Sequence, residues 1–259
     1  GILVYNYRTD KYEQPDTDFP TDVRTMVLQG DTLWIGSLNG LYTYQLKSRQ
    51  LNHFDSKQTG LPHNTIYSVI QTKDNQIYIG TYNGLCRYVQ ASGKFENILL
   101  PVNRGGSNLF VNSLLEDTTR QCIWIGMEGY LFQYNPTTGE MKAIEVFHNN
   151  SIKSLALDGD ENLLAGTDNG LYVYQNDKEP LQHIIHDSRN IQSLTNNIIW
   201  NIFSDQEHNI WLGTDYGISL SRYNSALQFV PISQITGTGD GNQFYSLFRD
   251  SKGFYWFGG

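Results

Sequence analysis

The chain has 259 residues, of which 39% are apolar and 17% are charged, and its net charge is −8. This acidic balance argues against a nucleic-acid partner, because binding a phosphate backbone needs a concentrated basic face. No apolar run reaches the length of about 18 residues that reads as a membrane span, so we expect no membrane contact by this segment. The two cysteines, Cys86 and Cys122, show neither metal-site nor redox spacing and are expected to be buried or half-buried thiols.

One pattern recurs along the chain. Six stretches align, and they read LWIGSLNGLYTY (33–44), IYIGTYNGLCRY (77–88), IWIGMEGYLFQY (123–134), LLAGTDNGLYVY (163–174), IWLGTDYGISLS (210–221) and the terminal YWFGG (255–259). Their first glycines are separated by 44, 46, 40, 47 and 45 residues. A period near 44 residues is typical of propeller blades.

Each repeat is predicted to form four antiparallel strands. The first strand is an alternating apolar run, which occurs at 22–28, 65–71, 110–117, 152–158, 197–205 and 242–250. A tight turn leads to the "IWIG" strand, and a second turn, often containing Asn-Gly, leads to the third strand. The fourth strand varies most and lies at 50–55, 94–99, 140–146, 181–186 and 227–232. No segment shows an apolar period of 3.6 residues, so we expect almost no helix.

Stacking of the repeats would bury both faces of every small sheet, which a single repeat cannot do. We therefore expect an all-β fold, a β-propeller of four-stranded antiparallel blades with about six repeats in this chain. The equivalent side chains Trp34, Tyr78, Trp124, Leu164, Trp211 and Trp256 are expected to pack between blades. The glycine two residues after each of them removes a side chain where the neighbouring blade must come close.

The two ends of the chain are predicted to be complementary half-blades of one propeller fragment spanning 1–259. Residues 1–16 align with the second half of a repeat, and residues 242–259 align with the first half. If the two halves share a blade, the ring has six blades. If they belong to different blades, a seven-bladed ring needs a further repeat, and the sequence leaves both alternatives open.

The repeated pattern I-W-I-G-T-x-x-G-L-x-x-Y, preceded by N-x-I-x-x-L-x-x-D, resembles the two-component regulator propeller repeat. The match is close at NIIWNIFSDQEHNIWLGTDYG (197–217) and extends over nearly the whole chain. Three departures occur. Tyr130 takes the usual turn glycine position, Ser221 stands where other repeats carry Tyr, and Leu164-Ala165 replaces Trp-Ile.

The resemblance implies a sensor segment of a hybrid two-component histidine kinase. Such proteins typically carry two seven-bladed propellers and a small β-sandwich outside the cytoplasm, and many respond to oligosaccharides. A periplasmic location within an inner-membrane protein, contacts with a neighbouring propeller and the β-sandwich, and homodimerisation are therefore implied. This segment shows no kinase phosphate-binding motif, so we expect it not to be an enzyme.

A ligand is expected at the end of the blades where the entries to first strands and the second-to-third loops meet. Asn, Asp, Thr and Tyr are common there, and these side chains suit sugar hydroxyls and the C–H face of a sugar. One aligned position near the start of each first strand carries Arg24, Tyr67, Asn112, Lys153, Trp200 and Tyr245. The loops add His63, Tyr82, Asp168, Asn197, Asp215 and Tyr216.

Other motifs carry less weight. The run GTGDG (237–241) precedes a strand rather than a helix, so it lacks the helix terminus of a phosphate site. The run DGDEN (158–162) aligns with hairpin turns and has Asn169, not Glu, at the twelfth calcium-loop position. We therefore expect no metal and no cofactor.

Two other functions remain open. A propeller lyase or glycosidase would need convergent carboxylates, and Glu128, Asp168 and Asp215 are the only acidic residues in the second-to-third loops. A protein-binding scaffold would instead expose an apolar patch.

Overall fold

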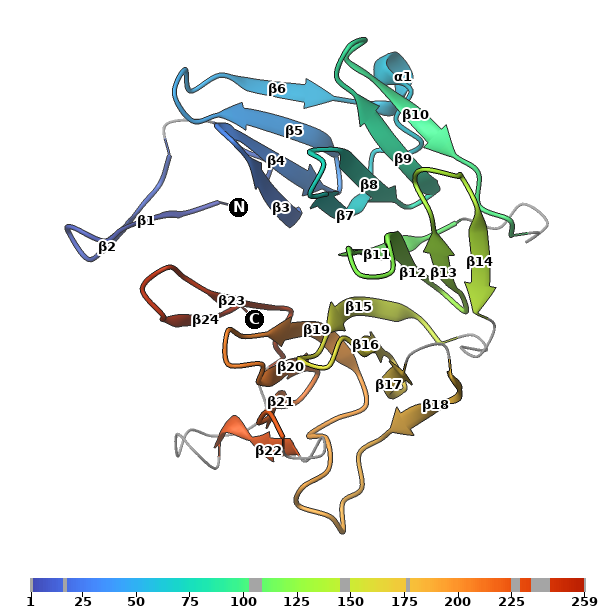
Figure 1. Ribbon diagram of the computed structural model, residues 1–259. Coiled ribbons are helices and arrows are strands. Elements are labelled where there is room, and N and C mark those ends of the chain that lie inside the picture. The colour runs from blue at the N-terminus through green and yellow to red at the C-terminus, as the bar shows by residue number, and fades with distance from the viewer. Residues whose placement is uncertain are drawn as a thin grey trace. The chain divides into compact units, whose positions relative to one another are not determined.

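The computed structural model describes residues 2–15, 18–102, 109–144, 150–175, 178–224, 229–233 and 243–258, without the side chains of 178–181 (Figure 1). Its chain divides into two compact units, residues 1–118 and residues 119–259. Both units are built from small antiparallel sheets, and helix is sparse. The all-β prediction with four-stranded antiparallel blades is therefore confirmed.

The first unit contains a two-stranded sheet, two complete repeats and the first strand of a third repeat. Its strands are β1 (Val4–Asn6), β2 (Lys11–Glu13), β3 (Val23–Gln29), β4 (Thr32–Ser37), β5 (Gly40–Gln45), β6 (Leu51–Phe54), β7 (Ile66–Gln71), β8 (Ile77–Thr81), β9 (Gly84–Val89), β10 (Lys94–Ile98) and β11 (Val111–Asp117). One helical turn, α1 (Ser56–Thr59), follows β6. The sheet orders β3-β4-β5-β6 and β7-β8-β9-β10 follow the chain, as the repeat pattern predicts.

The second unit continues the same arrangement. Its strands are β12 (Cys122–Met127), β13 (Leu131–Tyr134), β14 (Met141–Ile144), β15 (Ile152–Leu157), β16 (Leu163–Thr167), β17 (Gly170–Gln175), β18 (Lys178–Ile184), β19 (Ile199–Ser204), β20 (Ile210–Thr214), β21 (Gly217–Ser221), β22 (Phe229–Pro231), β23 (Ser246–Arg249) and β24 (Tyr255–Gly258). Two complete sheets, β15-β16-β17-β18 and β19-β20-β21-β22, again follow the chain order.

The half-repeats at the two ends each form a separate hairpin. Strand β1 pairs with β2, and β23 pairs with β24, both in antiparallel register. The complementarity of 1–16 and 242–259 stays a prediction.

A side-chain hydroxyl closes the second-to-third loop of four repeats. The hydroxyl of Thr81 donates to the carbonyl of Gly84 at 2.9 Å and accepts from the amide of Asn83. The same pair of bonds forms at Ser37, Thr167 and Thr214. In the repeat that has Tyr130 in place of the turn glycine, Gly129 takes the positive φ, at 77°, so the turn remains accessible to this sequence.

The glycine of the second strand lies where the next repeat comes closest. A Cβ on Gly80 would lie 2.7 Å from both Val111 Cγ1 and the Val111 carbonyl oxygen, and one on Gly166 would lie 2.7 Å from Ile199 Cγ2. A Cβ on Gly36 would lie 2.7 Å from Ile66 Cγ2, and one on Gly213 would lie 2.7 Å from the Phe244 carbonyl oxygen. These contacts confirm the predicted close approach and explain why no larger side chain fits.

Most of the aromatic positions pack between repeats as predicted. Trp34, Tyr78, Trp124 and Leu164 are all at most 3% exposed. Trp211 and Trp256 are half-buried instead, and their indole N–H groups each donate to an aspartate of the preceding turn, Asp205 and Asp250, at 2.9 Å. Both cysteines are buried free thiols, as expected, and burial raises the pKa of Cys86.

Candidate ligand-binding site

The aligned first-strand position coincides with a β-bulge in four repeats. The pairing register shifts between Val23 and Thr25, Ile66 and Ser68, Ile152 and Ser154, and Ile199 and Asn201. The residues skipped are Arg24, Tyr67, Lys153 and Trp200. A bulge leaves one residue out of the ladder and changes where its side chain points. These four repeats therefore present the side chain on the same backbone feature, which the sequence alignment did not reveal.

In the second unit the bulge residues form a compact cluster around Trp200. The Trp200 indole N–H donates to Asp215 Oδ1 at 3.1 Å, and the Tyr245 ring packs edge-on against the indole at 5.1 Å between centroids. Lys153 Nζ lies 4.2 Å from the centroid of the Trp200 ring. This cation–π contact and the Asp215 bond fix the indole from two directions. We call Lys153, Trp200, Asp215 and Tyr245 the tryptophan cluster.

One further residue supports the cluster. The Gln243 amide donates to Asp215 Oδ1 at 2.8 Å, and its carbonyl oxygen accepts from the Tyr245 hydroxyl. Gln243 was missed by sequence reasoning, although it lies two residues before Tyr245 in the same apolar run. Tyr245 remains 47% exposed, so the cluster reaches solvent.

Lys153 carries the main electrostatic perturbation of the cluster. Burial lowers the pKa of its ammonium, and the carboxylates of Asp168 and Asp215 partly oppose that shift. Asp168 Oδ1 also accepts the backbone N–H of Ser151 at 3.0 Å. The cluster thus combines a partly desolvated cation, one carboxylate and two aromatic rings, with Asp168 as a second carboxylate acting on Lys153.

The first unit brings its predicted residues together through aromatic contacts. Phe110 packs edge-on against Tyr82 at 4.4 Å and lies 6.4 Å from Tyr67, while His63 lies 4.8 Å from Tyr82. Burial raises the pKa of Tyr67, and the charge of Arg24 opposes the shift. We call His63, Tyr67, Tyr82 and Phe110 the phenyl cluster. Phe110 was not predicted, although it stands two residues before Asn112.

Three predicted residues take other places. Asn197 serves a turn, because its side-chain oxygen accepts the His186 amide at 2.6 Å and its carbonyl accepts the Gly170 amide at 2.7 Å. The Tyr216 side chain is 52% exposed at the tip of its hairpin. Asn112 is half-buried in β11. Loop residues Asn149 and Asn242, and the run 237–241, lie outside the described residues.

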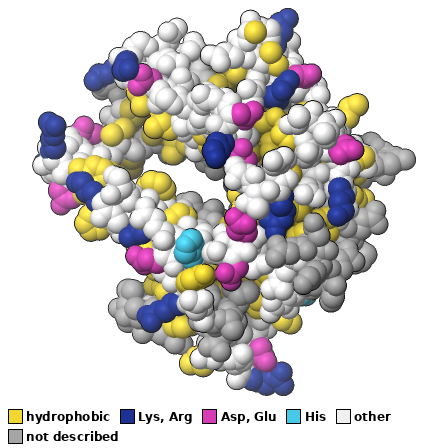
Figure 2. Space-filling model, in the orientation of Figure 1, with side chains coloured by type: hydrophobic (Ala, Val, Ile, Leu, Met, Phe, Trp, Pro, Cys, Tyr) yellow, Lys and Arg dark blue, Asp and Glu magenta, His cyan; other side chains and the backbone are white. Residues whose placement is uncertain are grey.

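The acidic residues considered for an enzyme have the following contacts. Asp215 accepts from Trp200 and Gln243, Asp168 accepts from Ser151, and Glu128 forms an isolated bridge with Ser151. Among the described residues no three His, Cys, Asp or Glu side chains gather as metal ligands, and no helix is long and apolar enough to cross a membrane. Lys and Arg side chains are scattered over the visible face rather than gathered in one patch (Figure 2).

The repeats and their turns define a propeller-type fold of four-stranded antiparallel sheets. The family model described as "Two component regulator propeller" matches residues 60–83 and 193–216, in two different units. The chain therefore carries two-component regulator propeller repeats, as the sequence resemblance indicated.

Two relatives place the chain more closely. The extracellular domain of a hybrid two component system from B. thetaiotaomicron is 83% identical, with a TM-score of 0.84, over 100% of this chain and 35% of that one. Histidine kinase P4 from Formosa agariphila is 27% identical in an alignment that covers 86% of this chain and 17% of the kinase. The chain thus spans about a third of the solved B. thetaiotaomicron domain.

A more distant structure shares the fold alone. Virginiamycin B lyase from Staphylococcus aureus is 11% identical, with a TM-score of 0.66, over 92% of this chain and 77% of that one. The propeller fold therefore occurs both in sensor domains and in enzymes, and the fold by itself does not decide between them.

Proposed function

We propose that this segment is a non-catalytic, periplasmic sensing module that recognises an oligosaccharide through the tryptophan cluster. The observation that carries the proposal is the arrangement of Trp200 between Lys153, Asp215 and Tyr245. Aromatic rings suit the C–H face of a sugar, and an adjacent carboxylate, amide and ammonium suit its hydroxyls.

The position of the cluster supports recognition of a chain rather than of a single small molecule. Trp200 and Tyr245 come from adjacent repeats, and Asp215 comes from the second-to-third loop that follows Trp200. A ligand that contacts all of them must span the boundary between two repeats. Successive sugar rings of an oligosaccharide meet that requirement.

Several observations favour sensing over catalysis. Glycoside hydrolysis typically needs two carboxylates facing one bond, with one held protonated. Here Asp168 accepts a hydrogen bond from the Ser151 backbone. Asp215 accepts from the Trp200 indole and the Gln243 amide rather than from a second acid. The virginiamycin B lyase likeness is limited to the fold and adds no catalytic residue.

The location and partners follow from the relatives. The B. thetaiotaomicron domain is described as extracellular, which supports a periplasmic position for this segment on an inner-membrane kinase. Because the chain spans about a third of that domain, neighbouring propeller and β-sandwich domains, and a homodimer, are its proposed partners. In this arrangement ligand binding would bias the contacts that the segment makes with those domains.

Titration calorimetry against a panel of neutral and acidic oligosaccharides, with chromatographic analysis of the mixtures, tests the proposal. We expect saturable heat with at least one oligosaccharide, no released product, and loss of binding in Trp200→Ala. The matched control is Tyr216→Ala, an exposed aromatic of the same unit outside the cluster. Release of a shortened sugar, or equal loss of binding in both variants, would contradict the proposal.

A further inference from the structure

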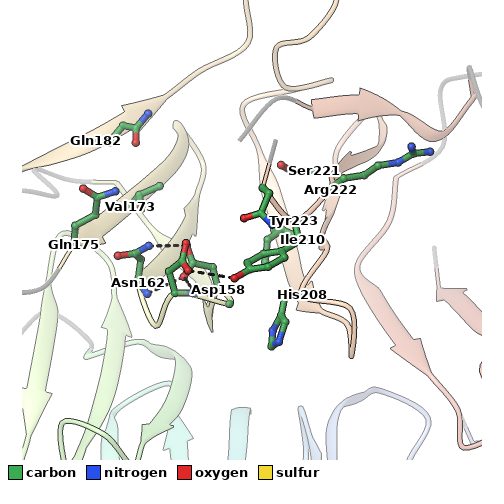
Figure 3. A pocket seen from close by; sticks show the side chains of 13 residues that line it. Asp158, Asn162, Val173, Gln175, Gln182, His208, Ile210, Ser221, Arg222 and Tyr223 are labelled. Carbon is green, nitrogen blue, oxygen red and sulfur yellow. Dashed lines mark hydrogen bonds between the residues drawn. The ribbon is translucent and has the colours of Figure 1, made fainter. Parts of the chain in front are cut away.

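A cavity of about 340 Å³ lies between the repeats β15–β18 and β19–β22 (Figure 3). One side is formed by the turn 158–162 and the ends of β17 and β18, and the other by His208, Ile210 and residues 221–224. The first-to-second and third-to-fourth turns meet at this end, whereas Asp168 and Asp215 belong to the other end. The cavity is therefore separate from the proposed oligosaccharide site.

The cavity exists because two repeats depart from the pattern. In the first unit, Tyr88 at the end of the third strand packs on Trp34 of the preceding repeat, with centroids 4.9 Å apart. Tyr174 packs in the same way on Trp124, at 5.8 Å. At the next boundary Ser221 replaces the tyrosine, and Leu164 replaces the tryptophan of the preceding repeat.

The register shows that Ser221 occupies the same place as these tyrosines. Ser221 pairs with Ile210 of its second strand, just as Tyr174 pairs with Leu163. Exchange of a phenol for a hydroxymethyl group leaves the groove between the two repeats unfilled. Protein interiors are otherwise close-packed, so an opening at this particular boundary is a property of these two substitutions.

The floor of the cavity is apolar and its strand side carries amides. Val173 and Ile210 are 1% and 3% exposed. Gln182 pairs directly with Val173 across β17 and β18, so these two side chains share one face of the sheet. Gln175 also lines the cavity, beyond a register shift in β17 that separates it from Val173. Neither glutamine amide bonds another side chain within the described part of the chain. Both amides therefore offer donors and acceptors to a ligand.

The opposite wall is aromatic. The Tyr223 hydroxyl donates to Asp160 Oδ1 at 3.4 Å, and the His208 ring lies 5.2 Å from the Tyr223 ring (Figure 3). Asp158 is occupied, since it accepts the Asn162 side-chain amide at 2.8 Å and two backbone N–H groups of its own turn. The lining includes two carboxylates, Asp158 and Asp160, and one guanidinium, Arg222, so it carries more negative than positive charge.

We propose that this cavity is a second binding site, for a small neutral polyhydroxylated ligand of monosaccharide or disaccharide size. The volume lies near the lower limit of about 300 Å³ for small-molecule pockets, which excludes a long chain. The two glutamine amides, a phenol and an imidazole match hydroxyl groups, while the apolar floor matches C–H groups. The excess of carboxylate disfavours anionic sugars. This inference does not depend on the function proposed above.

Proton–carbon NMR of the histidine imidazoles in the full 259-residue chain provides the test, with D-glucose, D-galactose, D-xylose and sucrose as probes. His208 is the only histidine lining the cavity. We expect at least one probe to shift the His208 signals saturably. The same probe should shift these signals equally in the Trp200→Ala variant, which lacks the other proposed site. Failure of all four probes to move the His208 signals at concentrations up to about 50 mM, which covers affinities weaker than 1 mM, would overturn the proposal.

Two variants at one position separate filling of the cavity from loss of a hydroxyl. Ser221→Tyr restores the residue type of the other repeats and should reduce probe affinity at least tenfold. Ser221→Ala leaves the space open and should retain binding. Gln182→Ala, in which a strand amide is removed without filling the groove, should weaken binding severalfold and covers the case in which Ser221→Tyr fails to fold. Unchanged affinity in Ser221→Tyr or in Gln182→Ala would contradict the assignment.

Discussion

The phenyl cluster of the first unit and the tryptophan cluster of the second are built on the same backbone and differ in chemistry. Tyr67 and Trp200 both occupy the bulge of a first strand. Around Tyr67 the contacts are between rings, with Phe110 and Tyr82 edge to face. Around Trp200 a carboxylate and an ammonium join the ring of Tyr245. The repeated backbone thus fixes where a side chain is presented, and the sequence at one position per repeat decides what it can bind.

The two clusters also differ in solvation. The tryptophan cluster holds a lysine whose pKa is lowered by burial beside two carboxylates, so its ammonium is already partly removed from water. Such a group loses less solvation when a ligand covers it. This is why the tryptophan cluster, and not the phenyl cluster, is the ligand site that we propose.

The largest expected effect is on stability, from substitutions at the second-strand glycine that lets neighbouring repeats come close in both units. A Cβ alone would come within 2.7 Å of Val111 at position 80 and of Ile199 at position 166. Gly80→Val and Gly166→Val add two further methyl groups at these places. We expect each to lower the free energy of unfolding by about 3 kcal/mol, measured by urea denaturation.

A substitution at another glycine serves as a control, because it introduces backbone strain without a steric clash. Gly217 has a φ of 94° and nothing within 4 Å of its Cβ position. Gly217→Ala should therefore cost only about 1 kcal/mol. Equal losses in Gly166→Val and Gly217→Ala would show that the close approach between repeats is not tight.

The comparison between clusters is sharpened by matched aromatic deletions. Trp200→Ala should weaken oligosaccharide binding at least tenfold, or about 1.4 kcal/mol, because it removes the ring that Lys153 and Asp215 orient. Tyr67→Ala should change the affinity less than twofold. Calorimetry with the same oligosaccharide measures both, and a larger effect at Tyr67 would reverse the assignment of the site.

The repeat that carries Trp200 is also expected to depend on pH through Asp205. This carboxylate is 4% exposed; burial raises its pKa, but donors from Trp211, Tyr255 and Asn209 outweigh burial and leave the pKa lowered. Because the folded pKa is lowered, the stabilisation is present above the ordinary value of 3.8 and is lost as pH falls through the folded pKa. In the first unit Trp34 binds the neutral Gln29 instead, at 3.0 Å.

Deletion of a single donor tests that network. Tyr255→Phe removes the 2.8 Å bond to Asp205 and should cost about 1 kcal/mol at neutral pH, with less cost in acid. The same substitution at Tyr12, which is 61% exposed in the first unit, should be neutral at every pH. A pH-independent loss in Tyr255→Phe would contradict the account.

The smallest effect is on Lys153. Its pKa should be below the ordinary value of 10.5, and Asp215→Asn should lower it further, because a carboxylate that opposes the burial shift is removed. Carbon NMR of the lysine Cε signals measures both values. A pKa at or above 10.5, or an upward shift in Asp215→Asn, would mean that the cluster is more hydrated than described.

Much of this organisation follows from the sequence because it repeats. The strand order, the close approach at Gly80 and Gly166, and the burial of Trp34 and Trp124 depend on local patterns that recur at a fixed period. The bulges do not follow, since a bulge residue and a paired residue look alike in an alternating run. Gln243 and Phe110 also escaped prediction, because their roles depend on contacts with other segments.

The departures from the pattern were informative in a different way from that expected. Ser221 and Leu164 are visible in the sequence as exceptions to the repeat. The pairing of neighbouring repeats shows that both lie at one boundary, where Ser221 lines the cavity. In repeat proteins, exceptions at facing positions are therefore worth examining in pairs.

The most direct test of the central claim is fluorine NMR of the chain labelled with 5-fluorotryptophan, titrated with an oligosaccharide that binds in calorimetry. Five tryptophans give five signals, and each can be assigned by a Trp→Phe variant. The account predicts that the Trp200 signal shifts with the calorimetric affinity while those of the buried Trp34 and Trp124 stay in place. A Trp200 signal that does not move while the sugar binds would contradict it.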